Sequence, residues 1–320
     1  MTSLTQQNPP HLWRVEPNGD LRIAHHPGQW QAHQSTRRII AILAGTQGGK
    51  TTYGPVWLER EIDRCGEGDY LAVSATYDLL KLKMLPALRE YFEYTLWNVH
   101  RARYYPSDRI LAIKNPEARI ILRSAESGGG LESSTAKAAW GDEAGMDSFT
   151  LETHEAIMRR LSLSQGRLLY TTTIYNLGWL KSHIYDRWRA GDASIDVIQF
   201  DSTANPAFPK AEYERARASM PLWKFNMFYR GRFERPAGLI YDCFREDAHI
   251  VPARVLPDKW PRYLGLDFGG VNTAGVFMAA EVDGEGKESG RLFLYREYKN
   301  GGRTAADHAR ELLRGEPMIP

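Results

Sequence analysis

Short apolar runs alternate with helical patterns along the first 236 residues. Each run is bounded by turn residues, as expected of a buried strand. The predicted strands are Ile39–Leu43, Tyr70–Ala75, Arg167–Thr173 and Ile195–Phe200, with a hairpin of Arg109–Lys114 and Ala118–Ser124, and the predicted helices are Pro55–Asp63, Leu79–Tyr94, Thr153–Leu161 and Lys210–Met220. This alternation predicts an α/β fold whose mostly parallel central sheet is flanked by helices and binds its ligand at the carboxyl ends of the strands.

The pattern changes after residue 236. Prolines punctuate residues 237–261, which predicts a linker. Three predicted strands follow, Tyr263–Asp267, Thr273–Val282 and Arg291–Tyr298, and a helix begins at Thr304. We therefore predict one domain over 1–236, a linker over 237–261 and a second domain over 262–320.

Composition narrows the class of protein. At 320 residues the chain is long enough for two domains, and 42% hydrophobic with 25% charged residues is typical of soluble globular proteins. No apolar run approaches the ~20 residues that cross a membrane, and the N-terminus lacks the layout of a signal peptide. Cys65 and Cys243 are far apart without metal-ligand partners, so we expect a cytoplasmic location and no disulfides. A net charge of +2 neither indicates nor excludes a nucleic-acid partner.

The first predicted strand leads into residues typical of a phosphate-binding loop. Gly48 and Gly49 precede Lys50 and Thr51, and a helix follows. Backbone N–H groups and the helix N-terminus would face the anion, Lys50 would reach the β- and γ-phosphates, and Thr51 would ligate Mg²⁺. The usual Gly-x4-Gly-Lys-Ser/Thr spacing has Ala44 in place of its first glycine, so a glycine-rich turn with a surface lysine stays the alternative. The predicted ATP-binding residues are Gln29, Gly45, Thr46, Gln47, Gly48, Gly49, Lys50, Thr51 and Thr52.

Gln29 enters that set because it lies in a short predicted helix ahead of the loop, after the turn signal Pro27-Gly28. A glutamine there can hydrogen-bond both edges of adenine. Gln31 is the second candidate, and a polar turn residue is the plainer interpretation.

Two further stretches suit ATP hydrolysis. Asp142 and Glu143 close a short apolar run, where Asp142 would hold Mg²⁺ through water and Glu143 would orient and deprotonate the attacking water. Such a dipeptide alone is common in exposed turns. Because this one follows a phosphate loop in an α/β pattern, it becomes a candidate for ATP hydrolysis. The strand Arg167–Thr173 ends in Thr171, Thr172 and Thr173, which could sense the loss of the γ-phosphate or reflect strand propensity only.

In this order and spacing the stretches resemble the large subunit of tailed-bacteriophage terminases, the DNA-packaging motors. The matching pieces are HPGQWQ, AGTQGGKT, SATYDLLK, ILRSAESGGGLESS, AAWGDEA, RLSLSQGRLLYTTT, NPAFPKAEYERAR with MFYRGRFE, and YLGLDFG. The resemblance implies a P-loop NTPase fold and an ATPase that moves DNA. The residues it assigns are Gly45, Gly49, Lys50 and Thr51 in the phosphate loop, Glu143, Lys50 and Asp142 in catalysis, and Thr171, Thr172 and Thr173 in coupling.

The resemblance also implies partners: double-stranded DNA, a small terminase subunit, a portal protein and further copies in a ring, in the cytoplasm of a bacterial host and without a membrane. Many terminases carry an arginine in the loop, where this chain has Thr46-Gln47, so that arginine would come from Arg159, Arg160 or a neighbouring subunit. DNA contacts would be mostly to phosphates. Candidates are Lys81, Lys83, Lys137 and the arginines of 101–109.

The last domain resembles the start of an RNase H-like nuclease. By that resemblance Asp267 and Glu297 would hold divalent Mg²⁺ or Mn²⁺, which activates water against a DNA phosphate. The fold needs further strands and at least one more acid than 262–320 hold, so we expect little or no DNA cleavage by this chain. Two alternatives to a packaging motor stay open, a helicase-like or repair P-loop ATPase and an inactive prophage remnant.

Overall fold

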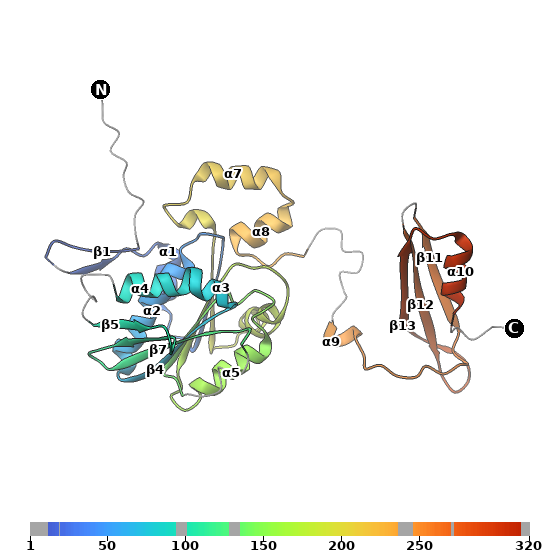
Figure 1. The fold of residues 1–320 in the computed structure, drawn as a ribbon, viewed down its shortest axis with the longest axis horizontal. Helices are drawn as coiled ribbons and strands as arrows, with labels where there is room; N and C mark the ends of the chain where they lie inside the picture. Colours follow the sequence, from blue (N-terminus) through green and yellow to red (C-terminus); the bar gives the residue numbers. More distant parts are fainter. Residues whose placement is uncertain are drawn as a thin grey trace, which may run out of the picture. The chain divides into compact units, whose positions relative to one another are not determined.

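The structure, a computed structural model, describes residues 12–18, 20–93, 101–127, 135–235, 246–269 and 272–314. The chain forms two compact units, Met1–Asp242 and Cys243–Pro320 (Figure 1). The division falls inside the predicted linker at 237–261. Each unit has its own sheet, and each is described by itself below.

An eight-stranded sheet forms the centre of the first unit, in the order β10-β3-β9-β8-β4-β7-β6-β5. Its strands are β3 (Ile39–Ala44), β4 (Gly68–Ser74), β5 (Ala102–Tyr105), β6 (Ile110–Ile113), β7 (Ala118–Ser124), β8 (Ala138–Asp142), β9 (Arg167–Thr172) and β10 (Ile195–Phe200). Neighbours from β10 to β7 run parallel, whereas β6 and β5 are antiparallel additions at one edge. The predicted mostly parallel sheet is confirmed, and β9 separates β3 from β8.

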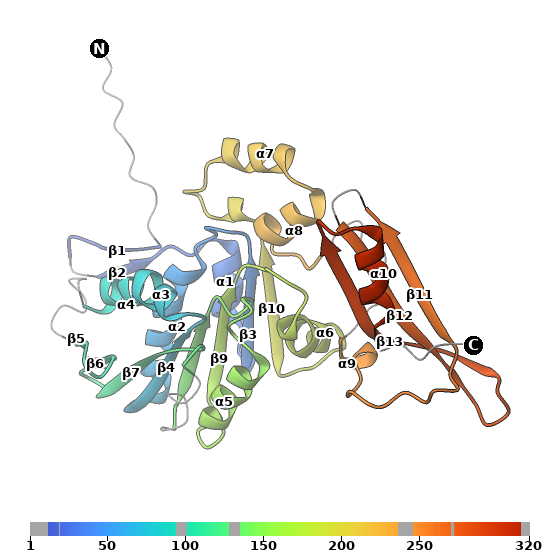
Figure 2. The ribbon, with the colours of Figure 1, turned by 45° about the vertical axis from the view of Figure 1, so that its right-hand side comes forward.

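Helices cover both faces of this sheet (Figure 2). They are α1 (Pro27–Gln34), α2 (Lys50–Cys65), α3 (Tyr77–Leu79), α4 (Leu85–Phe92), α5 (Leu151–Leu161), α6 (Asp186–Arg189), α7 (Lys210–Ser219) and α8 (Leu222–Arg230). Alternate residues of β3 enter separate cores: Ile40 and Ile42 pack with α2 and α4, whereas Ala41 and Leu43 pack with α5 and α8. Because both faces of the central strands are buried, their sequences are apolar throughout, which is why the pattern predicts them.

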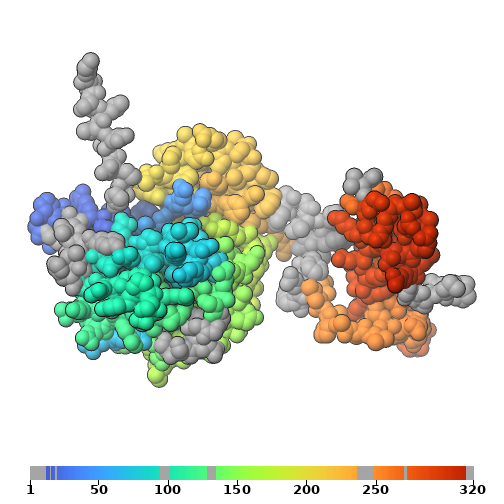
Figure 3. Space-filling model, in the orientation of Figure 1, coloured from blue at the N-terminus to red at the C-terminus, as the bar shows by residue number. Residues whose placement is uncertain are grey.

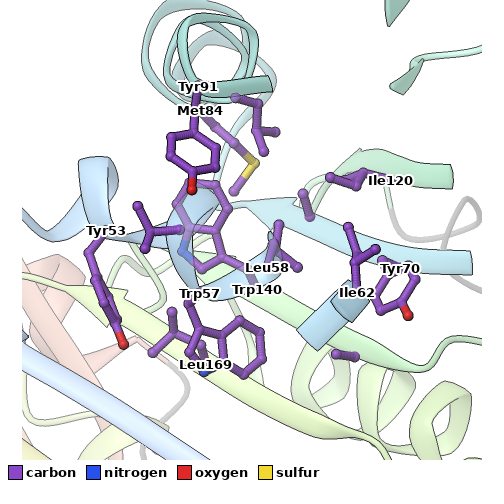
Figure 4. Close-up of a cluster of buried hydrophobic side chains, with 14 of the residues drawn as sticks. Tyr53, Trp57, Leu58, Ile62, Tyr70, Met84, Tyr91, Ile120, Trp140 and Leu169 are labelled. Carbon is purple, nitrogen blue, oxygen red and sulfur yellow. The ribbon is translucent and has the colours of Figure 1, made fainter. Parts of the chain in front are cut away.

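The core on the α2 face holds the helix after the loop firmly against β8. Trp57, Leu58 and Ile62 of α2 lie close to Trp140 of β8 and to Leu169 of β9 (Figure 4). Trp57 and Trp140 are completely buried. Packing of this kind fixes the start of α2 relative to the end of β8.

The helical run from α3 to α4 is widened by a π-turn, η1 (Leu80–Met84), in which the Leu85 N–H donates to the Leu80 carbonyl. Pro86 gives the physical reason. Proline has no N–H for the carbonyl four residues earlier, and its ring clashes with that carbonyl in an α-helix, so a wider turn relieves the conflict. A second π-turn, η2 (Lys181–Tyr185), precedes α6. The sequence pattern predicts helix here but not the widening.

Two short strands that the sequence pattern does not predict, β1 (Trp13–Val15) and β2 (Leu21–Ile23), lie ahead of α1 and form a hairpin. Its apolar residues pack on the α2-face core, and the Trp13 ring meets the Tyr91 ring edge-on with centroids 5.9 Å apart. At the other end of the unit's sequence, α7 and α8 form a surface lobe, joined to β10 through the short helix η3 (Ser202–Ala204) (Figure 3).

The second unit contains an antiparallel sheet in the order β11-β12-β13, with β11 (Arg262–Phe268), β12 (Asn272–Val282) and β13 (Glu288–Gly301). The helix α10 (Ala305–Leu313) follows, and α9 (Glu246–His249) precedes the sheet. Phe277, Tyr298 and Leu312 form a small core between the sheet and α10. The three strands and α10 occur in the order that the sequence predicts. Their assignment to an RNase H-like fold stays a prediction.

Candidate functional site

The predicted phosphate loop lies between β3 and α2, at the carboxyl end of β3. Gly49 has a φ of 80° and Gln47 a φ of 54°, so the loop makes left-handed turns. A Cβ on Gly45 would lie 2.2 Å from the Tyr229 carbonyl oxygen, so only glycine fits there. Ala44, where the usual motif has glycine, is the fully buried last residue of β3. The position where only glycine fits is therefore Gly45, one residue after the position that the usual Gly-x4-Gly-Lys-Ser/Thr spacing gives to glycine.

Four consecutive carbonyls of the loop accept hydrogen bonds from side chains outside it. The donors are Ser202 Oγ to Thr46 (2.7 Å), Asn205 Nδ2 to Gln47 (2.7 Å), His26 Nε2 to Gly48 (3.1 Å) and Gln29 Nε2 to Gly49 (2.9 Å). With these oxygens engaged on the outer side, they do not repel an anion from the interior of the loop. The loop is thus built into shape before any phosphate arrives.

His26 has a defined role in this scaffold. Its Nδ1 accepts from the N–H groups of Gly28 and Gln29 and caps α1, which leaves Nε2 to donate to the Gly48 carbonyl. Burial lowers the pKa of His26, against the opposing effect of the Gly48 hydrogen bond, which suits the neutral form with one donor and one acceptor. His26, Ser202 and Asn205 are not predicted from the sequence, although Pro27 in the first turn of α1 is a signal that a helix starts there.

Gln29 also uses both ends of its amide inside the protein. Besides donating to Gly49, its Oε1 accepts from the His26 N–H at 3.2 Å, and the side chain is buried. In this structure Gln29 therefore braces the loop. Contact with adenine stays a prediction, and it would require these hydrogen bonds to rearrange.

Lys50 points back into the loop. Its Nζ donates to the carbonyls of Gly45 (2.6 Å) and Ala44 (3.0 Å), and the residue is only 6% exposed. Burial lowers the pKa of Lys50 to about 8, although the carboxylates of Glu143 and Asp142 act in the opposite direction. An anionic ligand in the loop would further stabilise this buried ammonium, whose two hydrogen bonds go to neutral carbonyl groups.

The predicted partners of the loop converge on it from the end of β8. Thr51 Oγ1 donates to Asp142 Oδ2 at 3.1 Å, although the two residues are 91 positions apart. Asp142 is 2% exposed, and burial, followed by the nearby Glu143 carboxylate, raises its pKa. A hydroxyl and a carboxylate oxygen meeting beside a phosphate loop are the donor set that Mg²⁺ prefers, so these residues fit the predicted ion.

Glu143 follows in a backbone conformation that is rare for residues other than glycine, with a φ of 54°. Its N–H donates to the Thr171 carbonyl at 2.7 Å, which ties this residue to β9. Its Oε2 accepts from the Tyr175 hydroxyl at 3.0 Å, and its Oε1 lies 3.5 Å from the Nζ of Lys83. Neither Tyr175 nor the Lys83 contact is predicted by the sequence analysis.

The three threonines at the carboxyl end of β9 play different roles. Thr171 donates to Asp142, whereas the Thr172 hydroxyl donates to the Thr173 carbonyl and accepts from the Gly145 N–H. Thr173 lines a cavity of about 400 Å³ beside the loop. The other residues around this cavity are Thr46, Tyr175, Met220, Lys224, Phe228 and Tyr229. All three threonines are buried next to the candidate site.

Other predicted residues lie away from this centre. The Arg160 carbonyl accepts from the Ala136 N–H just before β8, so Arg159 and Arg160 lie at the amino ends of the strands, opposite the site. Neither arginine therefore lies beside the candidate site of its own chain, and a role for them in hydrolysis stays a prediction. Lys137 donates to the Cys65 carbonyl at 2.8 Å, at the same distant end. The glycine-rich segment 128–134 of the terminase resemblance lies outside the described residues.

The two predicted nuclease acids are exposed on one face of the second unit's sheet. Asp267 of β11 lies opposite Ala274 of β12, and Glu297 of β13 lies opposite Val276 of β12. The two acids are therefore on either side of β12 and two residues apart along it. Within the described ranges, no group of three or more His, Cys, Asp or Glu side chains could hold a metal ion. Asp267 and Glu297 thus have no third such ligand beside them among the described residues, and metal binding by these two acids stays a prediction.

Two general expectations can be set against the structure. No helix in the part of the chain that the structure describes has both the length and the apolar character needed to cross a membrane. Cys65 is a free thiol, and Cys243 lies outside the described residues.

The order of the strands and the position of the loop define a class, that of α/β domains with a large, mostly parallel sheet and a candidate phosphate-binding loop at the carboxyl ends of its strands. No family model and no curated protein matches the sequence. Solved structures do match. The large terminase of a thermophilic bacteriophage is 18% identical with a TM-score of 0.59, over 91% of this chain and 73% of that chain.

Further matches agree with the first. The ATPase domain of the Thermus phage P74-26 large terminase is 19% identical with a TM-score of 0.56, over 66% of this chain and 95% of that chain. The HK97 bacteriophage large terminase is 15% identical with a TM-score of 0.55, over 92% of this chain and 67% of that chain. The terminase of the thermophilic phage also matches as complexes with ATP-gamma-S and with ADP. The chain has the fold of phage large terminases, as the sequence resemblance predicts.

Proposed function

We propose that the protein is the ATP-hydrolysing motor subunit of a viral DNA-packaging terminase. One observation carries the proposal: Lys50 and Thr51 of the loop meet Asp142 and Glu143, residues that are distant in sequence, at the carboxyl end of the sheet. The fold of large terminases, seen in complexes with ATP-gamma-S and ADP, supports the same assignment. We assign the nucleotide phosphates to the loop 45–52.

In this proposal each residue has a distinct task. Lys50 leaves its carbonyl partners and binds the β- and γ-phosphates. Thr51 and Asp142 would hold Mg²⁺, and the bound ion would supply positive charge to balance the charge that develops on the transferred phosphoryl group. Glu143 accepts a proton from the attacking water, and Tyr175 orients its carboxylate. The contact between Thr171 and Asp142 then passes the change at the phosphate to β9.

Double-stranded DNA is the proposed substrate for translocation, with a small terminase subunit, a portal protein and further copies of the chain in a ring as partners. The arginine that stabilises the transition state then comes from another copy, because Arg159 and Arg160 lie at the opposite end of the sheet. We infer that the second unit is related to RNase H-like nucleases and that Asp267 and Glu297 would bind divalent metal there. We expect little or no DNA cleavage by the 320-residue chain, and a plasmid-nicking assay of that chain with Mg²⁺ or Mn²⁺ tests this.

Steady-state ATP hydrolysis tests the main proposal. We expect turnover by the wild-type chain with Mg²⁺ and none above background for Lys50→Ala or Glu143→Ala, with thermal melts to verify folding. Equal rates for all three proteins would contradict the proposal and favour a remnant without turnover. Stimulation by single-stranded rather than double-stranded DNA would favour a helicase-like or repair ATPase.

A further inference from the structure

The cavity of about 400 Å³ beside the phosphate loop has walls from three parts of the first unit. One wall is Thr46 of the loop, another is Thr173 and Tyr175 after β9, and the third is the lobe of α7 and α8. The Thr46 N–H donates to the Phe228 carbonyl of α8 at 2.7 Å, so hydrogen bonding holds the loop and the lobe together around this space. The cavity is therefore a built feature of the unit.

Tyr175 connects the cavity to the candidate catalytic residues. Its hydroxyl donates to Glu143 Oε2 at 3.0 Å, and the centre of its ring lies 6.1 Å from that of Phe228, which also lines the cavity. Thr46 belongs to the beginning of the loop, whereas Gln29 braces the end of the loop. The cavity thus adjoins the part of the site where a terminal phosphate would be cleaved.

The lining of the cavity favours a small anion that is held weakly. Among the described residues that line it, Lys224 is the only charged side chain, and Thr46 and Thr173 bring hydroxyl groups. Lys224 is exposed, and its Nζ lies 5.7 Å from the centre of the Phe228 ring. The carboxylate of Glu143 next to the cavity repels an anion. A site that attracts an anion without retaining it suits a product on its way out.

Inorganic phosphate is the anion that the proposed reaction supplies at this place. Hydrolysis of ATP by water leaves ADP and one phosphate ion. That ion has one phosphorus and four oxygen atoms, and the cavity can hold it together with water, because a water molecule takes about 30 Å³ in the liquid. Lys50 and Asp142 are buried below the candidate site, so the cavity is an open route beside a closed floor.

We propose that this cavity binds inorganic phosphate and that Lys224 draws the product out of the catalytic site. The inference rests on the proposed function, which places ATP hydrolysis at the loop. The phosphate ion moves from the loop past Thr46 and Thr173 to Lys224, and from there into solvent. Lys224 binds the product and takes no part in the cleavage of ATP.

The first test measures phosphate binding without nucleotide or turnover, by the broadening of the phosphorus NMR signal of inorganic phosphate. Lys50→Ala removes the lysine of the loop, so binding in this background reports on the cavity. We expect weak binding by Lys50→Ala and an affinity about fivefold lower when Lys224→Gln is added, the size of one charged contact at an exposed position. Met220→Trp in the same background should lower the affinity as well, because the larger side chain fills the cavity without a change of charge.

Lys210→Gln is the matched control for the loss of charge. Lys210 is the exposed first residue of α7, whereas Met220 at the other end of that helix lines the cavity. At 1.5 Å per residue the helix separates the two positions by about 15 Å. The control removes the same charge from the same lobe, so in the Lys50→Ala background it should leave phosphate affinity unchanged. Thermal melts verify that each variant is folded.

The second test follows a single turnover of ATP. Chemical quenching measures the formation of ADP, and a fluorescent phosphate-binding protein measures the phosphate that has reached solution. We expect phosphate release by Lys224→Gln to lag behind ADP formation, with a release rate about fivefold below that of wild type. Lys210→Gln should show the same interval between the two signals as wild type.

Three results would overturn the inference. One is equal phosphate affinity, or equal lack of binding, in Lys50→Ala with and without Lys224→Gln. Another is phosphate release by Lys224→Gln that keeps pace with ADP formation as in wild type. The third is a loss of adenosine binding rather than phosphate binding in Met220→Trp, which would assign the cavity to a nucleobase. A chain without ATP turnover would contradict the proposed function, and the first test would still decide whether the cavity binds phosphate.

Discussion

The Thr171 hydroxyl donates a 2.6 Å hydrogen bond to Asp142 Oδ1, and the two residues stand directly opposite each other on the parallel strands β9 and β8. Trp140 Nε1 donates in turn to the Thr171 hydroxyl oxygen at 2.7 Å. This buried chain links the end of the sheet to the carboxylate proposed to hold Mg²⁺. Any change at Asp142 therefore reaches β9 through one hydrogen bond, and not through a distant relay.

The first prediction removes this hydroxyl. Thr171→Val keeps the shape of the side chain but leaves the indole N–H of buried Trp140 without its acceptor, so the free energy of unfolding should fall by about 1–3 kcal/mol. ATP turnover should fall as well, because Asp142 loses a donor that orients it. Urea unfolding and an ATPase assay measure the two effects. Thr171→Ser keeps the hydroxyl and should lose little stability or ATP turnover. A Thr171→Val variant as stable as wild type would show that the hydrogen bonds from Trp140 through Thr171 to Asp142 do not stabilise the fold.

The second prediction distinguishes a brace of the loop from a contact with adenine. Because the Gln29 amide bonds Gly49 and His26 at its two ends, Gln29→Ala should weaken ATP and GTP binding by a similar factor. His26→Ala should do the same, since it frees the neighbouring Gly48 carbonyl. Titrations with fluorescent analogues of both nucleotides measure the affinities. A loss confined to ATP in the Gln29 variant would instead support the adenine contact.

Much of the first unit can be predicted from the sequence because its central strands are buried on both faces. β10 has the predicted bounds, Ile195–Phe200, and β9 and β3 differ from prediction by one residue at the carboxyl end. The pairing of the loop with the acids follows from the rule that ligands bind at the carboxyl ends of parallel strands. Local pattern and general topology are sufficient for these features.

The remaining features depend on contacts that no local pattern carries. The side chains that hold the loop carbonyls come from 20 to 158 positions away. The pattern over Leu80–Met84 predicts an ordinary α-helix. The wider hydrogen bonding of the π-turn is attributed to a single residue, Pro86, which does not alter that pattern. Arg159 and Arg160 were reasonable candidates by composition, but α5 runs so that its last turn meets the amino end of β8. The direction of α5 therefore places both arginines away from the candidate site of their own chain, which residue type alone does not reveal.

The third prediction concerns Gly54, in the second turn of α2. Replacing a helical glycine by alanine normally stabilises a protein by up to about 1 kcal/mol. Here a Cβ would lie 2.2 Å from Trp140 Cε2, within the packing that holds α2 against β8. We therefore expect Gly54→Ala to reduce the free energy of unfolding by about 1–3 kcal/mol. Gly284→Ala is the control, since nothing lies within 4 Å of its Cβ. Stabilisation of the Gly54 variant in a thermal melt would contradict the close packing.

The last prediction concerns pH. His154 of α5 is 8% exposed and its Nδ1 lies 2.7 Å from the Tyr170 hydroxyl. Burial, and after it the charges of His183 and Arg187, lower the pKa of His154 to about 4 from an ordinary value of 6.5. Between these values the unfolded chain binds a proton that the folded protein does not. The free energy of unfolding should therefore fall as the pH drops from about 6.5 to 4, by about 3 kcal/mol for this group. Above pH 6.5 the contribution of His154 should not depend on pH.

His154→Gln isolates that contribution. The glutamine amide can still hydrogen-bond the Tyr170 hydroxyl, but it does not titrate, so the variant should lose less stability than wild type between pH 6.5 and 4. His25, whose pKa burial also lowers to about 4, titrates in both proteins and cancels from the comparison. Urea unfolding across the range measures the difference. Parallel stability curves for the two proteins would mean that His154 is protonated as readily in the folded state as in the unfolded one, and would refute the assignment of a neutral, buried imidazole beneath β9.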